Sequence, residues 1–138
     1  MRSLANRFTQ ELRSASVAFE RDADGALRVP ARCRDVGELV IALDDDEISV
    51  FIGEFTHCHF TPGACGDLEG TDRVGEAVRE AADFVRGVLA DQWVLWRYPN
   101  GGGGCYLLGD EEDPMADVPL GEDAQCYLWS GPYSRGAA

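Results

Sequence analysis

Apolar residues recur along the chain at two spacings, and these spacings separate the expected helices from the expected strands. Near the N-terminus, Leu4, Phe8 and Leu12 recur at every fourth position, which predicts a short amphipathic helix from Ser3 to about Ala15. A longer helical pattern runs from Thr71 or Asp72, either of which can cap a helix, to about Asp91. Its apolar positions are Val74, Val78, Ala81, Val85 and Val88. Two helices of unequal length are therefore expected.

The remaining apolar segments are rich in branched and aromatic residues and are bounded by turn-forming residues, which is typical of strands. The predicted strands cover residues 16–20, 26–29, 38–43, 48–60, 93–98, 105–108 and 125–130. Because most consecutive strands are joined by short turns, we expect antiparallel pairing. The sequence thus predicts one α+β domain over residues 1–138, in which a mainly antiparallel twisted sheet packs against the long helix and a short helix precedes it.

Charge narrows the choice of partners. The chain has 12 basic and 25 acidic residues and a net charge of -13. Residues 1–36 carry seven arginines against five acids, a net +2, whereas residues 37–138 carry five arginines against twenty acids, a net -15. Such a surface repels nucleic acid and anionic membranes, so we expect neither as a partner, and a basic protein is its electrostatic complement. The alternative is that the charge serves solubility alone.

The composition also excludes several classes of enzyme. All the basic residues are arginine, so a Walker phosphate loop, a pyridoxal-phosphate enzyme and a Schiff-base aldolase are excluded, since each needs a lysine. The five cysteines form an odd set without a Cys-x-x-Cys pair, and we expect reduced, mostly buried thiols. No apolar run has the length of a membrane span, and Met1–Arg7 is not followed by a signal-peptide pattern. We therefore expect a cytoplasmic protein.

His57 and His59 are the only histidines in the chain, and their spacing places both on one face of a strand. Such a pair can supply two ligands to zinc or iron. Candidates for further ligands are Glu54, Cys65, Asp67 and Glu69. The pair resembles the His-x-His of cupins, but the resemblance ends there because the long helix contradicts an all-β barrel. A cysteine–histidine dyad would need Cys65, since Cys58 alternates to the opposite side of a regular strand.

The same strand also suggests a binding surface. Ile48, Val50 and Ile52 share the core side, and the opposite side carries Ser49, Phe51, Phe55, His57 and His59, provided that Gly53 introduces no bulge. We expect this side to continue across the sheet to Trp96, Tyr98, Tyr127 and Trp129 and to contact a partner. The acidic run of Asp110, Glu111, Glu112 and Asp113 is expected to steer that partner. The alternative is that the N-terminal helix covers this side and the aromatic residues belong to the core.

From Glu38 to Trp129 the chain resembles a group of small bacterial proteins that includes immunity proteins of polymorphic toxin systems. The likeness lies in a strand ending in His-x-His-Phe, an amphipathic helix and a Trp-rich strand. The matching positions are His57, His59, Phe60, Trp93 and Trp96. The chain is also similar to type III secretion chaperones in its size, acidity and order of elements, although no helical pattern follows Gly131–Pro132.

Both resemblances imply binding to another protein. The expected function is therefore non-enzymatic and without a cofactor, and the resemblance implies an immunity protein that neutralises a basic toxin. The alternative is a metal-dependent enzyme or metal-binding protein that holds zinc or iron at His57 and His59. The sequence leaves open whether the chain acts as a monomer or as a homodimer.

Overall fold

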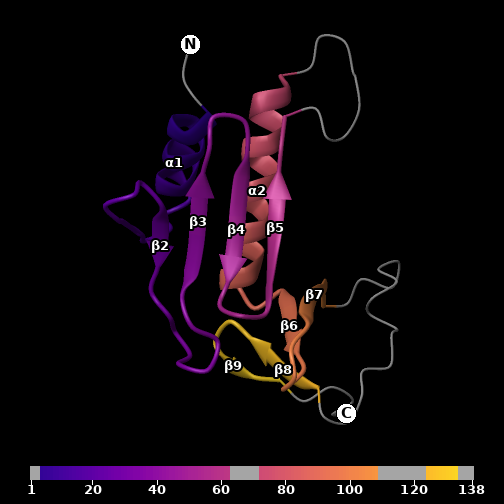
Figure 1. Ribbon diagram of the computed structural model, residues 1–138. Helices are drawn as coiled ribbons and strands as arrows, with labels where there is room; N and C mark the ends of the chain where they lie inside the picture. The colour runs from indigo at the N-terminus through magenta and orange to yellow at the C-terminus, as the bar shows by residue number, and fades with distance from the viewer. Residues whose placement is uncertain (1–3, 63–71, 109–123, 134–138) are drawn as a thin grey trace.

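The computed structural model describes residues 4–62, 72–108 and 124–133, which form an α+β fold (Figure 1). Over these residues there are two helices and two antiparallel sheets. The elements are α1 (Leu4–Ser14), β1 (Glu20–Arg21), β2 (Leu27–Val29), β3 (Leu39–Leu43), β4 (Ile48–Ile52), β5 (Thr56–Phe60), α2 (Arg73–Leu89), β6 (Trp93–Arg97), β7 (Gly103–Leu107), β8 (Gln125–Leu128) and β9 (Gly131–Pro132). The predicted fold class is confirmed, and both predicted helices are present.

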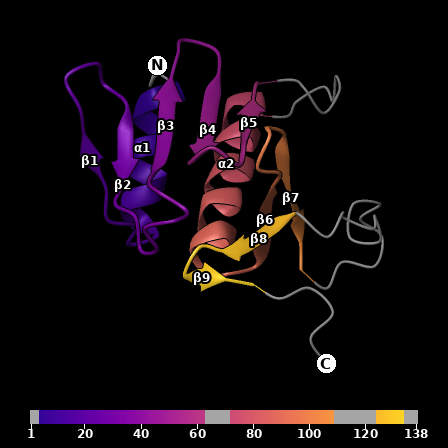
Figure 2. The same ribbon diagram turned by 60° about the horizontal axis from the view of Figure 1, so that its bottom comes forward.

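The larger sheet has the order β1-β2-β3-β4-β5, and both helices lie behind it (Figures 1 and 2). The helices bury their apolar stripes against the inward side chains of the central strands. This core contains Phe8 and Leu12 of α1, Val85 of α2 and Val50 of β4, each fully buried. The predicted alternative, in which the N-terminal helix covers the histidine side of the sheet, is therefore wrong, because α1 packs on the opposite side.

Asp72 begins α2 and also joins the two helices. Its carboxylate accepts a hydrogen bond from the backbone N–H of Gly75 at 3.0 Å, as an N-cap does, and lies 2.6 Å from a guanidinium nitrogen of Arg7 in α1. The hydrogen bond from Arg7 and the bond from Gly75 lower the pKa of Asp72 to about 2. The same side chain thus caps α2 and forms an ion pair with α1.

The second sheet, in the order β7-β6-β8-β9, packs near the turn that joins β4 to β5. Phe55 of that turn is only 2% exposed and meets the ring of Tyr127 edge-on, with 5.4 Å between the ring centroids. The guanidinium carbon of Arg97 lies 4.6 Å from the Phe55 ring centroid, and Arg97 Nε donates to the side-chain oxygen of Gln125. Phe55 therefore anchors the second sheet to the first.

Two expectations about the strands are corrected. Residues 48–60 do not form one strand, because the chain reverses between β4 and β5: Gly53 has a φ of +48°, and the N–H of Phe55 donates to the carbonyl of Ile52. The expected single sheet is also divided into two. The first strand, Glu20–Arg21, overlaps the predicted residues 16–20 only at Glu20, and the last predicted strand is followed by the short β9.

None of the helices over the described ranges has both the length and the apolar character that crossing a membrane requires.

Candidate functional site: an open sheet face with two histidines

Strand pairing brings the candidate residues together on the side of the larger sheet that faces away from the helices. Arg28 pairs with Val40, Val40 with Phe51, and Phe51 with His57, so these four residues form a row across β2, β3, β4 and β5. A second row contains Ala42, Ser49 and His59. Because residues directly opposite one another in an antiparallel pair share a face, both rows lie on one surface. We call Val40, Ala42, Ser49, Phe51, His57 and His59 the outer face.

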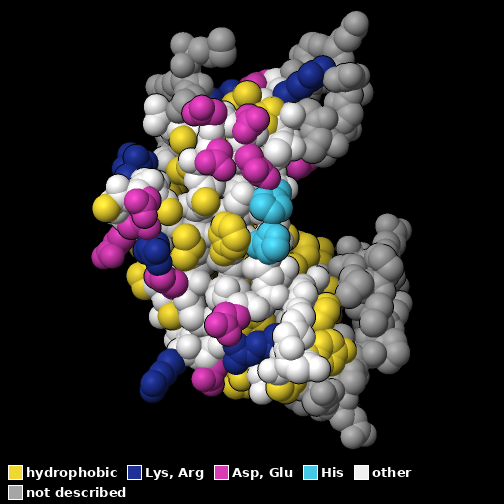
Figure 3. Space-filling view, viewed as in Figure 1, with side chains coloured by type: hydrophobic (Ala, Val, Ile, Leu, Met, Phe, Trp, Pro, Cys, Tyr) yellow, Lys and Arg dark blue, Asp and Glu magenta, His cyan; other side chains and the backbone are white. Residues whose placement is uncertain are grey.

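Three rings form the centre of the outer face. Phe51 and His57 stack with 5.6 Å between ring centroids, and His57 meets His59 edge-on at 4.9 Å. Phe51 is 39% exposed, and the His59 side chain is 47% exposed. The space-filling view shows apolar side chains beside the two histidines on this surface (Figure 3). The outer face therefore offers an aromatic cluster to the solvent.

His59 is held in place through one of its ring nitrogens. Glu47 Oε1 and Ser49 Oγ each lie 2.8 Å from Nδ1 of His59. Since Nδ1 makes both contacts, a ligand of this ring would bind at Nε2. The carboxylate of Glu47 supports the ring in the manner of the outer-shell carboxylates that orient metal-binding histidines.

Acidic residues border the outer face. Asp44, Asp45 and Asp46 are exposed at the turn between β3 and β4, and Glu47 follows them. Figure 3 shows acidic side chains gathered at this end of the sheet, above the histidines. We call Asp44, Asp45, Asp46 and Glu47 the acidic rim. Glu47, the last residue of this rim, contacts His59.

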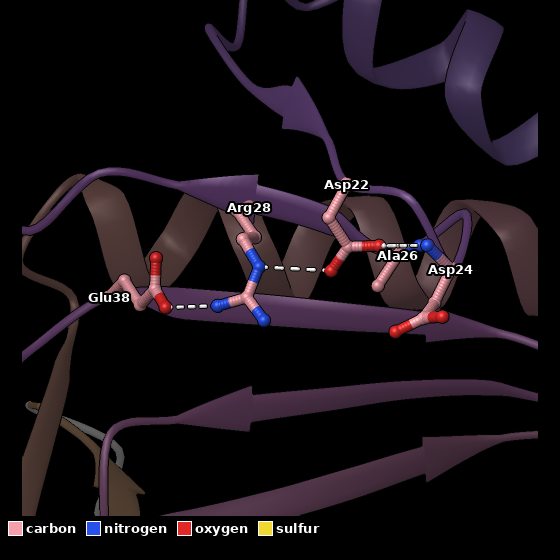
Figure 4. Close-up of polar contacts among 5 residues, drawn as sticks. All are labelled: Asp22, Asp24, Ala26, Arg28 and Glu38. Carbon is pink, nitrogen blue, oxygen red and sulfur yellow. Dashed lines mark hydrogen bonds and ion pairs between the residues drawn. The ribbon is translucent and has the colours of Figure 1, made fainter.

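Arg28, the basic residue of the first row, forms ion pairs with two carboxylates. Arg28 donates through Nε to Asp22 at 3.0 Å and through Nη1 to Glu38 (Figure 4). The hydrogen bond from Arg28 is the largest cause of the lowered pKa of Asp22, so this carboxylate stays ionised at neutral pH. One positive and two negative charges leave this corner of the surface with a net charge of -1.

The structure separates the predicted surface residues into three groups. Phe51, His57 and His59 lie together on the outer face. Trp96, Tyr98 and Tyr127 are half-buried in the second sheet, and Phe55 and Trp129 are 2% and 4% exposed. The expectation that Phe55 and Trp129 belong to an exposed face is wrong, because Phe55 fills the junction of the sheets and Trp129 joins the core. Asp110, Glu111, Glu112 and Asp113 lie outside the described residues.

Sequence reasoning missed Val40 and Ala42 as surface residues. They belong to the uninterrupted apolar run of β3, Leu39–Leu43, in which Leu39 and Ile41 are buried in the core. A continuous apolar run is typical of strands covered on both faces, whereas a strand with one solvated face alternates apolar and polar residues. The lack of alternating polar residues in β3 was therefore the sequence signal that its outer-face residues are apolar.

The histidine pair supplies two possible metal ligands. Over the described ranges, no group of three or more His, Cys, Asp or Glu side chains is placed to hold a metal ion. Three of the candidates for further ligands, Cys65, Asp67 and Glu69, lie outside those ranges. Among the described residues, the structure thus places two candidate ligands side by side, with Glu47 against one of them.

A groove lies at the β5 end of the larger sheet, beside the outer face. It has a volume of about 740 Å³, and among its lining residues are Cys58, His59, Phe84 and Trp93. Cys58 alternates away from the histidines, as predicted, and its thiol is hydrogen-bonded to Cys105 of β7. This bond lowers the pKa of Cys58 from an ordinary 9.0 to about 7 despite partial burial.

Comparisons of the chain with models of known protein families, with curated proteins and with solved structures found no match in any of the three.

Proposed function

We propose that this protein binds a basic protein partner through the outer face. The observation that carries the proposal is an apolar and aromatic sheet face that both helices leave uncovered and that acidic residues border. Monomeric proteins seldom leave a sheet face of this character exposed unless it contacts something else. Val40, Ala42 and Phe51 would supply the desolvated centre, and the acidic rim would meet the positive charge of the partner.

The three rings suit this role. Phe51 is a large side chain with a preformed position against His57, so little conformational entropy would be lost when a partner covers it. The imidazoles add hydrogen-bonding atoms to an apolar patch, and such amphipathic groups are common at binding hot spots. Within this proposal, the resemblance to immunity proteins assigns the partner to the class of basic toxins. The function would then be neutralisation by occlusion, without catalysis by this chain.

Affinity capture from a lysate of the native host tests the proposal. The tagged protein is immobilised at low salt and the salt concentration is raised in steps. We expect a basic protein, stoichiometric with the bait, to elute as salt increases. The Phe51→Ala variant should lose this protein, whereas Leu108→Ala should retain it, since Leu108 is a similarly exposed apolar residue (43%) at the end of β7. Recovery of the bait alone at every salt concentration, or equal capture by Phe51→Ala, would contradict the proposal.

The arrangement around His59 favours metal binding as a second candidate function. Glu47 contacts Nδ1 of His59, which leaves Nε2 for a metal, and the ring of His57 is adjacent. This candidate, a metal-dependent enzyme or metal-binding protein, predicts zinc or iron bound to protein purified from metal-replete cells. The metal should be lost in the double variant His57→Ala, His59→Ala and retained in Cys126→Ala, whose sulfur belongs to the second sheet. Metal-free wild-type protein from such cells would count against it.

A further inference from the structure

The groove beside the outer face is lined by three aromatic rings in contact. Its lining residues come from β5, α2, β7 and the start of β6. Phe60 and Phe84 lie with 5.8 Å between their ring centroids, and Phe84 meets Trp93 edge-on at 5.0 Å. Phe84 is 7% exposed, whereas Phe60 and Trp93 are half-buried and keep part of their surface open to a ligand.

The position of the Trp93 ring depends on a glycine of α2. A Cβ on Gly87 would lie 2.9 Å from Nε1 and 3.1 Å from Cδ1 of Trp93, so the indole packs directly on the helix at this point. Its contacts with Gly87 and Phe84 hold the ring in one place. The aromatic wall of the groove is therefore formed before a ligand arrives, which lowers the entropy lost on binding.

The groove also carries negative charge. Among the described residues that line it, Glu80 and Asp83 are acidic and none is arginine. Both carboxylates are exposed on α2, and Glu80 lies one turn before Phe84. Asp83 forms an ion pair with Arg86, so two negative charges and one positive charge leave a net charge of -1 at this wall.

Aromatic rings beside carboxylates favour a flat cation. A guanidinium group is weakly hydrated, stacks on aromatic faces and donates paired N–H groups to a carboxylate, whereas an ammonium group is a compact and strongly hydrated charge. The chain itself contains such a contact, because the guanidinium of Arg97 lies over the rings of Phe55 and Tyr127. The groove therefore suits arginine better than lysine.

We propose that this groove receives an arginine side chain of the basic partner. His59 belongs to the outer face and also lines the groove, so a partner that covers the face would reach the groove directly. Charge complementarity supports this occupant, since a basic segment meets Glu80 and Asp83 there. The inference rests on the proposed function for the source of the arginine, but the chemistry of the groove can be tested without the partner.

The test is titration of the free protein with N-acetyl-arginine-N-methylamide, followed by NMR of the three tryptophan indole groups. We expect a saturable shift of the Trp93 signal and no shift of Trp96 or Trp129, because Trp93 is the one of the three among the described lining residues. N-acetyl-lysine-N-methylamide has the same charge and should bind about threefold more weakly. The neutral analogue N-acetyl-citrulline-N-methylamide should cause no shift.

Two pairs of variants separate this site from the general negative charge of the chain. Glu80→Gln should weaken binding of the arginine probe about threefold. Its control, Glu76→Gln, lies one turn earlier on α2 and outside the described lining, and should leave the affinity unchanged. Phe60→Leu should also weaken binding about threefold, whereas Phe19→Leu, which changes another phenylalanine that is partly buried against the core, should not.

Three results would overturn the inference: equal affinity for the arginine and lysine probes, equal shifts at all three indoles, or full affinity in both Glu80→Gln and Phe60→Leu. The outcome is distinguishable from failure of the proposed function. If the probe binds at Trp93 but no basic protein is captured from the lysate, the groove recognises arginine and the proposed function fails. If a basic protein is captured through Phe51 but the probe does not bind, the proposed function stands and this inference fails.

Discussion

Replacing Gly103 with alanine should reduce the free energy of unfolding by about 3 kcal/mol. A Cβ at this position would lie 2.3 Å from the carbonyl oxygen of Phe55 and 2.7 Å from that of Trp96. Both neighbours are backbone atoms, so neither can rotate away as a flexible side chain could. The contact lies where the second sheet meets the β4–β5 turn, and the substitution should therefore push the two sheets apart.

Chemical denaturation of the wild type and the variant measures this effect. The control is Gly131→Ala, because a Cβ on Gly131 would have no heavy atom within 4 Å and its φ is not positive. We expect this control to change the free energy of unfolding by less than about 0.5 kcal/mol. In a strand, glycine is normally less favourable than alanine. If Gly103→Ala were as stable as the wild type, the close approach of Gly103 to the Phe55 carbonyl would not determine the distance between the two sheets.

Neutralising the acidic rim should slow the association of the partner about tenfold at low salt. The variant Asp44→Asn, Asp45→Asn, Asp46→Asn removes three exposed negative charges beside the outer face. Long-range attraction sets the rate of encounter, so the dependence of the association rate on salt should also become flatter. The dissociation rate should change less, because the three side chains lie at the border rather than at the centre of the face. Surface plasmon resonance with the captured partner over a range of salt concentrations measures both rates.

The second acidic run provides a matched comparison. The variant Asp110→Asn, Glu111→Gln, Glu112→Gln, Asp113→Asn removes four charges that the sequence alone suggested for steering. We expect it also to slow association and weaken the salt dependence, since the field that attracts a partner is the sum over the surface. If neither variant alters the association rate, electrostatic steering is excluded as part of the binding mechanism.

Most of the secondary structure follows from local patterns in the sequence. The spacing of Val78, Val85 and Val88 with a capping residue at Asp72 predicted α2 correctly, since a long amphipathic stripe has few alternatives. The turn within residues 48–60 was missed because only Gly53 and Glu54 interrupt the apolar and aromatic residues there, and Gly53 was treated as a possible bulge. Its positive φ is fixed by tertiary contacts: its N–H donates to the carbonyl of Glu38, and a Cβ there would lie 2.0 Å from the carbonyl oxygen of Val36.

The candidate site was predictable only in part, for a related reason. Alternation placed Phe51, His57 and His59 on one side, and the register of β4 and β5 confirms it. Which side the helices cover depends on how the whole chain packs, and a strand pattern carries no such information when both faces are apolar. The burial of Phe55 likewise depends on Tyr127 and Arg97, which lie far away in the sequence. Strand periodicity thus identified the rings, and packing decided which of them stay exposed.

The central claim, that the outer face is the surface covered by the partner, can be tested on His57 and His59 directly. They are the only two histidines of the chain and both are exposed on that face, so carbethoxylation with diethylpyrocarbonate followed by mass spectrometry reports on it alone. In the free protein we expect both imidazoles to react. In the complex with the captured partner both should be protected, and high salt that dissociates the complex should restore the reaction. Equal reactivity of both histidines in the free protein and in the complex would contradict the account.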